Sequence, residues 1–211
     1  MSPIVRRINP AQCVFINCPF DSRYKPVFDA IVFTIFDCGF VARSALELVD
    51  SAENRLERIA RIIENCDFAV HDISRTELDV GTNLPRFNMP FELGLYLGAR
   101  RFGNDAQRRK NCLVMDKTRY RYQKFLSDIA GQDIAEHKND PRLASRRVRD
   151  WLNSVSKRDD IPGAPHIWKR FEAFQVDLPR LAKMRNLHPA DLQFKDLSNV
   201  IAHWLQKFGG P

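Results

Sequence analysis

The architecture of this chain follows from one sequence, Asn88-Met89-Pro90-Phe91-Glu92-Leu93-Gly94-Leu95-Tyr96-Leu97-Gly98-Ala99. It is typical of a loop that enters a helix, because Asn88 is a good N-cap and Pro90 suits a first turn. Gly94 and Gly98 each cost a helix interior about 1 kcal/mol relative to alanine, so we expect the helix backbone to approach a sheet closely there. Glu92 should lie in the first turn, where the helix dipole favours a carboxylate by roughly 0.3–1 kcal/mol.

Short apolar runs rich in β-branched and aromatic residues lie on both sides of this helix, and each predicts a strand. The expected strands are residues 13–18, 40–46, 68–73, 111–116 and the edge strand 132–137. Further helices are expected at residues 24–37, 55–65, 120–129 and 143–155, with a basic connector at 100–110. Since strands and helices alternate, the sequence predicts an α/β fold whose parallel five-stranded sheet has the flavodoxin-like order 2-1-3-4-5.

The sequence pattern changes after a charged segment that contains proline and glycine, residues 157–165. Such a segment is typical of a boundary, so we divide the chain into a sheet domain at 11–158 and a helical C-terminal extension at 159–211. Two helices are expected in the extension, at residues 167–176 and 191–208. The extension should pack onto the sheet domain or serve a partner.

The composition is that of an ordinary globular protein, with 44% hydrophobic and 28% charged residues among 211. The longest apolar runs, such as residues 30–36, are too short to span a bilayer. Residues 1–10 lack the apolar segment of a secretory leader. The five cysteines include no Cys-x-x-Cys pair, which favours reduced thiols, a cytoplasmic location and no metal site.

The net charge of +7 comes largely from arginines and lysines in the second half of the chain. Such a surface attracts polyanions or phosphorylated small molecules at long range, although it is also typical of a solvated basic face. A nucleotide or nucleoside small molecule is favoured as the partner over nucleic acid. A homo-oligomer and a protein partner that binds the C-terminal helices stay open.

The residues expected to carry chemistry lie where the first and third strands end and the next helix begins. In a sheet of this order those ends flank the switch point, where ligands bind. We therefore predict one crevice that gathers side chains from three segments. Its residues are Asn17, Pro19, Phe20, Asp21 and Arg23 from the first segment, Asp72, Ser74 and Arg75 from the second, and Asn88 and Glu92 from the third. The loop at 76–87 is longer than most connections of its kind, and long ordered loops often cover binding sites.

The two carboxylates, Glu92 and Asp72, are the predicted catalytic residues. Glu92 could attack an anomeric carbon as a nucleophile, or stabilise the oxocarbenium ion that forms when a glycosidic bond breaks. The alternative is that Glu92 serves the helix dipole at the surface. Asp72 could orient a sugar hydroxyl or protonate a leaving base, or it could cap the following turn.

The remaining crevice residues are predicted to bind the substrate. The backbone N–H groups of residues 19–23, together with Arg23 or Arg75, could hold a phosphate, although each arginine could instead form a surface ion pair. His71 is expected in the packing of the sheet, outside the site.

Three segments of the crevice resemble the nucleoside 2-deoxyribosyltransferase family and its relatives in the wider TIR-like superfamily. They are Ile16-Asn17-Cys18-Pro19-Phe20, Asp72-Ile73-Ser74 and Asn88-Met89-Pro90-Phe91-Glu92-Leu93-Gly94. The resemblance covers residues 13–137 and implies a flavodoxin-like sheet with a functional glutamate at Glu92. In the transferases that glutamate is the nucleophile on the sugar, and in TIR enzymes it is required to cleave the nicotinamide–ribose bond of NAD.

The chain departs from the transferase pattern in its long loop at 76–87 and in lacking an obvious aromatic-rich pocket for an acceptor base. Hydrolysis is therefore favoured over base exchange, with NAD as a substrate and no cofactor. The alternatives are a nucleoside or deoxynucleoside-monophosphate hydrolase or 2-deoxyribosyltransferase, and a non-catalytic nucleotide-binding module that signals through its helical tail. Bacterial TIR-like proteins often act in antiphage defence, a role that the resemblance permits.

Overall fold

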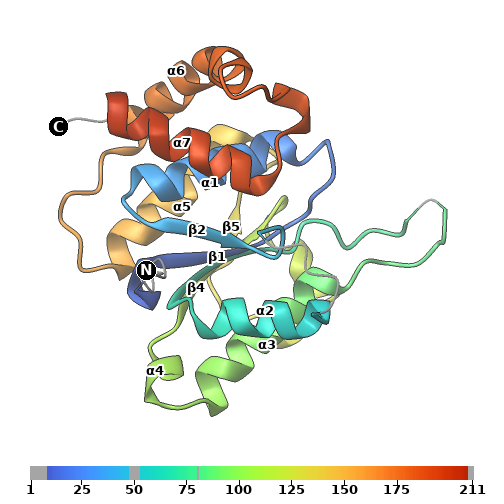
Figure 1. The fold of residues 1–211 in the computed structure, drawn as a ribbon. Coiled ribbons are helices and arrows are strands. Elements are labelled where there is room, and N and C mark those ends of the chain that lie inside the picture. The colour runs from blue at the N-terminus through green and yellow to red at the C-terminus, as the bar shows by residue number, and fades with distance from the viewer. Residues whose placement is uncertain (1–8, 48–52, 80, 209–211) are drawn as a thin grey trace.

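The chain folds around a five-stranded, all-parallel sheet in the order β2-β1-β3-β4-β5, as a computed structural model shows (Figure 1). The predicted α/β fold and strand order are confirmed. The structure describes residues 9–47, 53–79 and 81–208, so most of the segment examined for a leader and the last three residues of the extension lie outside it. The strands are β1 Cys13–Asn17, β2 Val41–Ser44, β3 Phe68–Asp72, β4 Asn111–Asp116 and β5 Ala135–Glu136.

Seven α-helices and four short 3-10 helices occur in the described ranges. The α-helices are α1 Lys25–Asp37, α2 Arg55–Glu64, α3 Asn88–Phe102, α4 Asp105–Arg108, α5 Pro141–Val155, α6 Ala164–Lys183 and α7 Phe194–Phe208. The 3-10 helices are η1 Pro10–Gln12, η2 Arg121–Lys124, η3 Ser127–Ile129 and η4 Pro189–Asp191. In the described part of the chain, no helix combines the length and the apolar character needed to cross a bilayer.

The helices form layers on the two faces of the sheet. In Figure 1, α2 and α3 cover one face and α1 and α5 the other, while α6 and α7 lie beyond α1. Alternate residues of β1 serve the two faces, as a pleated strand requires. Val14 and Ile16 pack towards α1, whereas Cys13 and Phe15 pack with Ile59 of α2 and Tyr96 of α3.

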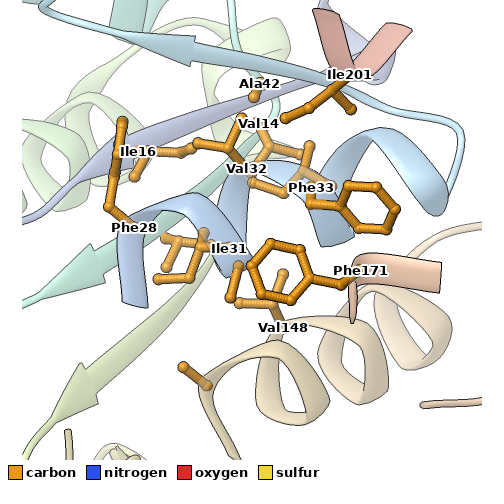
Figure 2. Close-up of a cluster of buried hydrophobic side chains, with 14 of the residues drawn as sticks. Val14, Ile16, Phe28, Ile31, Val32, Phe33, Ala42, Val148, Phe171 and Ile201 are labelled. Carbon is orange, nitrogen blue, oxygen red and sulfur yellow. The ribbon is translucent and has the colours of Figure 1, made fainter. Parts of the chain in front are cut away.

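The C-terminal extension shares the larger core of the sheet domain. Figure 2 shows Phe171 of α6 and Ile201 of α7 beside Phe33 of α1, in the cluster that also holds Val14 of β1. Phe33 contacts the rings of Phe171, Phe174 and Trp204 at centroid distances of 5.3–5.9 Å. The extension therefore packs onto the sheet domain through α1 and forms a further helical layer outside it.

The start of α3 differs from its prediction. Asn88 is the first helical residue, and Phe87 occupies the N-cap position without a side-chain cap. Because the Phe91 N–H donates to the Phe87 carbonyl oxygen at 2.9 Å, the helix begins one residue earlier than an Asn88 cap would place it. The predicted N-cap role of Asn88 is wrong. Glu92 is the fifth helical residue, so its predicted place in the first turn, which holds no acidic residue, is also wrong.

The two glycines of α3 are not points of close approach to the sheet, contrary to the prediction. A Cβ built on Gly94 or Gly98 would meet no atom within 4 Å. The sheet contact is made instead by Tyr96, whose buried hydroxyl donates to the carbonyl oxygens of Asp67 at 2.8 Å and Asn111 at 3.0 Å. A large side chain with a polar tip thus anchors α3.

Gly94→Ala should therefore raise the free energy of unfolding by roughly 0.5–1 kcal/mol, since alanine costs less backbone entropy in a helix. Urea denaturation measures the change. Gly39→Ala is the matched control and should destabilise, because Gly39 has a φ of +78° and its Cβ would meet the Arg158 guanidinium at 2.6 Å. A destabilised Gly94→Ala protein would contradict the open surroundings of this glycine.

Two other segments also differ from expectation. The basic connector expected at 100–110 is largely helical, because α3 continues to Phe102 and α4 follows. The helix expected at 120–129 is two 3-10 turns, η2 and η3. Tyr120 has a φ of +60°, a left-handed conformation that a continuous α-helix cannot include.

Candidate functional site

The ends of β1 and β3 meet the start of α3 at one buried side chain, Asn17. The Asn17 Nδ2 donates to the Met89 carbonyl oxygen in the first turn of α3 at 2.9 Å. The same nitrogen lies 2.9 Å from His71 Nδ1 on β3. Asn17 therefore ties together the three segments that the sequence placed at one crevice.

His71 supports this arrangement, although it was expected only in the packing of the sheet. Burial lowers the pKa of His71 to about 3, so the ring is neutral. Because the Asn17 amide donates to Nδ1, the ring proton lies on Nε2, which has no hydrogen-bond partner in the described part of the chain. The ring lies between Phe15 and Tyr96, at centroid distances of 5.9 Å and 5.1 Å. His71 is thus both a packing residue and the partner that orients Asn17.

Glu92 is buried, with 6% of its surface exposed. Its carboxylate has no hydrogen bond or ion pair with any described residue, which excludes the alternative of a surface residue that only serves the helix dipole. Burial raises the pKa of Glu92 from 4.5 to about 7, and the charge of Arg55 opposes that rise. A carboxylate of this kind stabilises a nearby positive charge more strongly than one in water.

The raised pKa of Glu92 implies a stability test. The folded protein holds a proton on Glu92 up to about pH 7, whereas the unfolded chain releases it near pH 4.5. The folded state is therefore destabilised, relative to the unfolded chain, as the pH rises from 4.5 to about 7. The loss of stability is complete above that range. Glu92→Gln should leave the free energy of unfolding nearly unchanged near pH 4.5 and should raise it by roughly 3 kcal/mol at pH 8. Urea denaturation at pH 4.5 and pH 8 measures this. Glu57→Gln, on the exposed face of α2, is the control, and it should change the free energy of unfolding by less than about 1 kcal/mol, the contribution of a first-turn carboxylate to the helix dipole.

Asp72 lies on the other face of the sheet from Glu92. It is two residues after Val70, which packs towards α1, and alternate residues of a strand point to the same face. The carboxylate is fully buried. Its Oδ2 accepts from the Tyr24 hydroxyl at 2.5 Å and lies 2.9 Å from His137 Nε2, while its Oδ1 accepts from the Ser74 N–H at 2.8 Å. Burial raises the pKa of Asp72, but His137 and the N–H and O–H donors outweigh it, and the pKa lies below its usual value.

This environment favours a structural role for Asp72, at the place where β3, the start of α1 and the end of β5 meet. A sealed, ionised carboxylate with both oxygens engaged reaches no leaving base, so a direct acid role does not fit. The alternative, capping the turn after β3, agrees with the Ser74 N–H contact. Sequence reasoning missed Tyr24 and His137. Tyr24 is the N-cap residue of α1 and His137 follows β5, and nothing in the local sequence pairs either residue with Asp72.

Part of the loop after β1 is already bonded to its own side chain, so the predicted phosphate site at residues 19–23 keeps only the N–H groups of Phe20, Asp21 and Ser22 without a partner in the described part of the chain. The N–H groups of Arg23 and Tyr24 both donate to Asp21 Oδ1, at 3.0 and 3.1 Å. Asp21 also pairs with Arg75, whose Nε lies 3.1 Å from Oδ2. Arg75 therefore forms the ion pair that was the alternative to its predicted role in phosphate binding. The Arg23 side chain is exposed and has no partner within the described ranges.

Three of the other predicted binding residues share a pocket. Pro19, Phe20 and Asp21 line a pocket of about 330 Å³ that faces η4 and the start of α7. The Ser74 hydroxyl is buried without a partner in the described structure. Asn88 is exposed at the start of α3. The structure therefore brings Asn17 and the start of α3 together. Asp72 and Ser74 lie in a buried layer, Asp21 of the pocket pairs with Arg75, and Arg23 is exposed.

The pocket corrects one expectation from the sequence, that the chain lacks an aromatic-rich pocket. Phe20, Phe28 and Phe194 line it, and the last of these belongs to the C-terminal extension. The loop at 76–87 also differs, because it forms a hairpin closed by Leu78 and Pro85 and projects from the body of the molecule (Figure 1).

No three His, Cys, Asp or Glu side chains gather as metal ligands in the residues that the structure describes. Comparison with known proteins found no matching family model, no matching curated protein and no matching solved structure. The functional assignment therefore depends on the geometry of the site.

Proposed function

We propose that this chain cleaves the N-glycosidic bond of a nucleotide, with Glu92 as the essential carboxylate and NAD as the favoured substrate. The observation that carries the proposal is the Glu92 carboxylate, which is buried and has no partner among the described residues, on the helix whose first turn is bonded to the end of β1. A protein does not retain a buried unpaired carboxylate for stability, since its desolvation is a cost. Perturbed carboxyl groups of this kind are typical of functional sites.

The chemistry follows from the charge that Glu92 can stabilise. As the bond between the anomeric carbon and the base nitrogen breaks, its electron pair leaves with the base and positive charge develops on the sugar. The Glu92 carboxylate would stabilise that charge, or attack the anomeric carbon and form a covalent intermediate. Water then adds to the anomeric carbon and loses a proton, which gives the free base and a ribosyl product.

The sealed environment of Asp72 supports NAD over an ordinary nucleoside. The nicotinamide ring of NAD is cationic while it is attached to ribose, and it leaves as a neutral molecule without being protonated. Purine and pyrimidine bases leave more readily when a general acid protonates them. Asp72, the predicted acid, is buried and ionised, so a substrate that needs no acid suits this site best.

The charge of the chain supports a phosphorylated substrate. The net charge is +7, and the exposed Arg23 belongs to the loop between β1 and α1. A positive surface beside a binding site raises the rate at which anionic ligands arrive. A nucleoside or deoxynucleoside-monophosphate hydrolase or transferase is the second candidate, and the aromatic pocket is the observation that favours it, because a base could occupy it.

The test is to incubate the purified protein with NAD and with a panel of nucleosides and nucleoside monophosphates, and to follow release of free base by chromatography. Nicotinamide release from NAD, lost in Glu92→Gln, is the expected result. Release from deoxynucleosides alone would favour the second candidate. No base release from any compound over a wide range of protein concentrations would contradict both candidates. It would leave the non-catalytic binding module.

A further inference from the structure

A pocket of about 330 Å³ lies between the loop after β1, the start of α1, and the segment that joins η4 to α7. Its volume is within the range of small-molecule sites, about 300–1,000 Å³. One wall comes from the sheet domain and the other from the C-terminal extension. The cleavage of NAD proposed at Glu92 assigns no role to the extension or to this pocket.

The apolar lining of the pocket includes three phenylalanine rings in a row, beside aliphatic side chains such as Leu46 and Leu197. Phe28 contacts Phe20 at a centroid distance of 5.7 Å and Phe194 at 6.0 Å. Phe28 and Phe194 are buried, whereas Phe20 is 43% exposed. A large apolar ring that lines a pocket at this exposure is available to stack with a planar ligand.

The polar lining consists of Asp21, which pairs with Arg75, and of Ser22, Lys25 and Gln193. Two of these side chains have hydrogen-bonding capacity to spare. Gln193 and Ser22 line the pocket, both are exposed, and neither side chain has a partner among the described residues. A glutamine amide offers one donor and one acceptor side by side, which matches the edge of adenine. Lys25 also lines the pocket, and its Nζ forms an ion pair with Asp29 Oδ2 at 2.8 Å.

From this combination we infer that the pocket binds the adenine ring of a nucleotide, with Phe20 as the stacking surface and Gln193 as the reader of the base. The choice of a nucleotide rests on the proposed function. The pocket itself is defined by the side chains that line it. The C-terminal extension then belongs to a ligand site, because it supplies Gln193 and Phe194.

The experiment is isothermal titration calorimetry of the full chain with AMP, and with CMP as the pyrimidine comparison. Saturable AMP binding is expected, with CMP at least about fivefold weaker, since a good bidentate pair discriminates by that much or more. Phe20→Ala should weaken AMP binding by roughly 5- to 150-fold through lost stacking. Gln193→Ala should bring the AMP affinity down towards that of CMP.

Two matched controls separate the pocket from general effects of the substitutions. Phe102→Ala removes a ring that is 86% exposed at the end of α3, and Gln206→Ala removes an exposed amide of α7 outside the pocket. Neither should change AMP binding. All four substituted positions are exposed, so the variants should fold, and circular dichroism checks that they do.

The inference is overturned if AMP does not bind at millimolar concentration, if CMP binds equally well, or if Phe20→Ala and Gln193→Ala bind AMP like the unsubstituted chain. Glu92→Gln should retain AMP binding while it loses base release. A chain that releases base but does not bind AMP in this pocket would overturn this inference alone, and a chain that binds AMP without releasing base would overturn only the proposed cleavage.

Discussion

Glu92→Gln should lower the rate of base release by roughly 10³-fold, because it removes the charge that stabilises the sugar cation while it keeps the shape of the side chain. The effect should fall on kcat more than on KM, since the carboxylate acts most strongly in the transition state. Chromatographic measurement of base release at saturating substrate checks this. Glu57→Gln, on the exposed surface of α2, is the control and should keep full activity. Equal rates for the Glu92→Gln and unsubstituted proteins would contradict the assignment.

The pH dependence of the same reaction gives an independent test of Glu92. The ionised carboxylate is the active form, and burial raises its pKa to about 7. For the free protein, kcat/KM should rise about tenfold per pH unit below pH 7 and level off above it. A profile that falls as the pH rises through 7 would mean that the protonated carboxyl is active, which would make Glu92 a general acid and favour an ordinary nucleoside as the substrate.

The strand order was predictable because it depends on local patterns. Apolar runs such as residues 111–116 alternate with amphipathic segments such as 55–65, and few topologies satisfy right-handed crossovers. The meeting of β1, β3 and α3 followed from that order. It did not require knowledge of the Asn17 contact with Met89 that holds these segments together.

The division of the site between two faces was not predictable in the same way. Adjacent strand residues point to opposite faces, so His71 faces α3 and Asp72 faces α1. The partners of Asp72 also come from distant positions. Tyr24 lies 48 residues before it, and the sequence pattern at His137 gives no sign of a contact that forms only when β5 joins the sheet.

The aromatic pocket was missed for a related reason. Phe20 and Phe194 are far apart in the sequence, and the second belongs to an extension whose place in the fold is set by the core beneath α1. The amphipathic pattern of α7 predicts that one face is buried, but it does not indicate which element of the fold covers that face. Long-range packing therefore decides which loops share a pocket.

Asp72→Asn should lower the free energy of unfolding by about 3–5 kcal/mol, because several buried groups that face the carboxylate would lose their acceptor, at about 1–3 kcal/mol each. The reason lies in the donors that face Asp72. His137 Nε2 lies 2.9 Å from Asp72 Oδ2, and the Asn139 N–H donates to His137 Nδ1 at 3.1 Å. Tyr24 and Ser74 donate to Asp72. An asparagine has one acceptor oxygen for these donors, and its own NH₂ group would face the rest.

Tyr24→Phe is the smaller companion of this change and should cost about 1 kcal/mol, since it removes one donor and leaves the carboxylate with two others. The pH dependence separates a charge effect from a packing effect. The pKa of Asp72 is lowered on folding, so its stabilisation is complete well above pH 3.8 and is lost as the pH falls from 3.8 towards the lower folded value. In urea denaturation the difference between Asp72→Asn and the unsubstituted protein should therefore shrink in acid. A difference that stays constant down to pH 3 would mean that Asp72 stabilises this end of the sheet through its shape, and that its charge is free for another role.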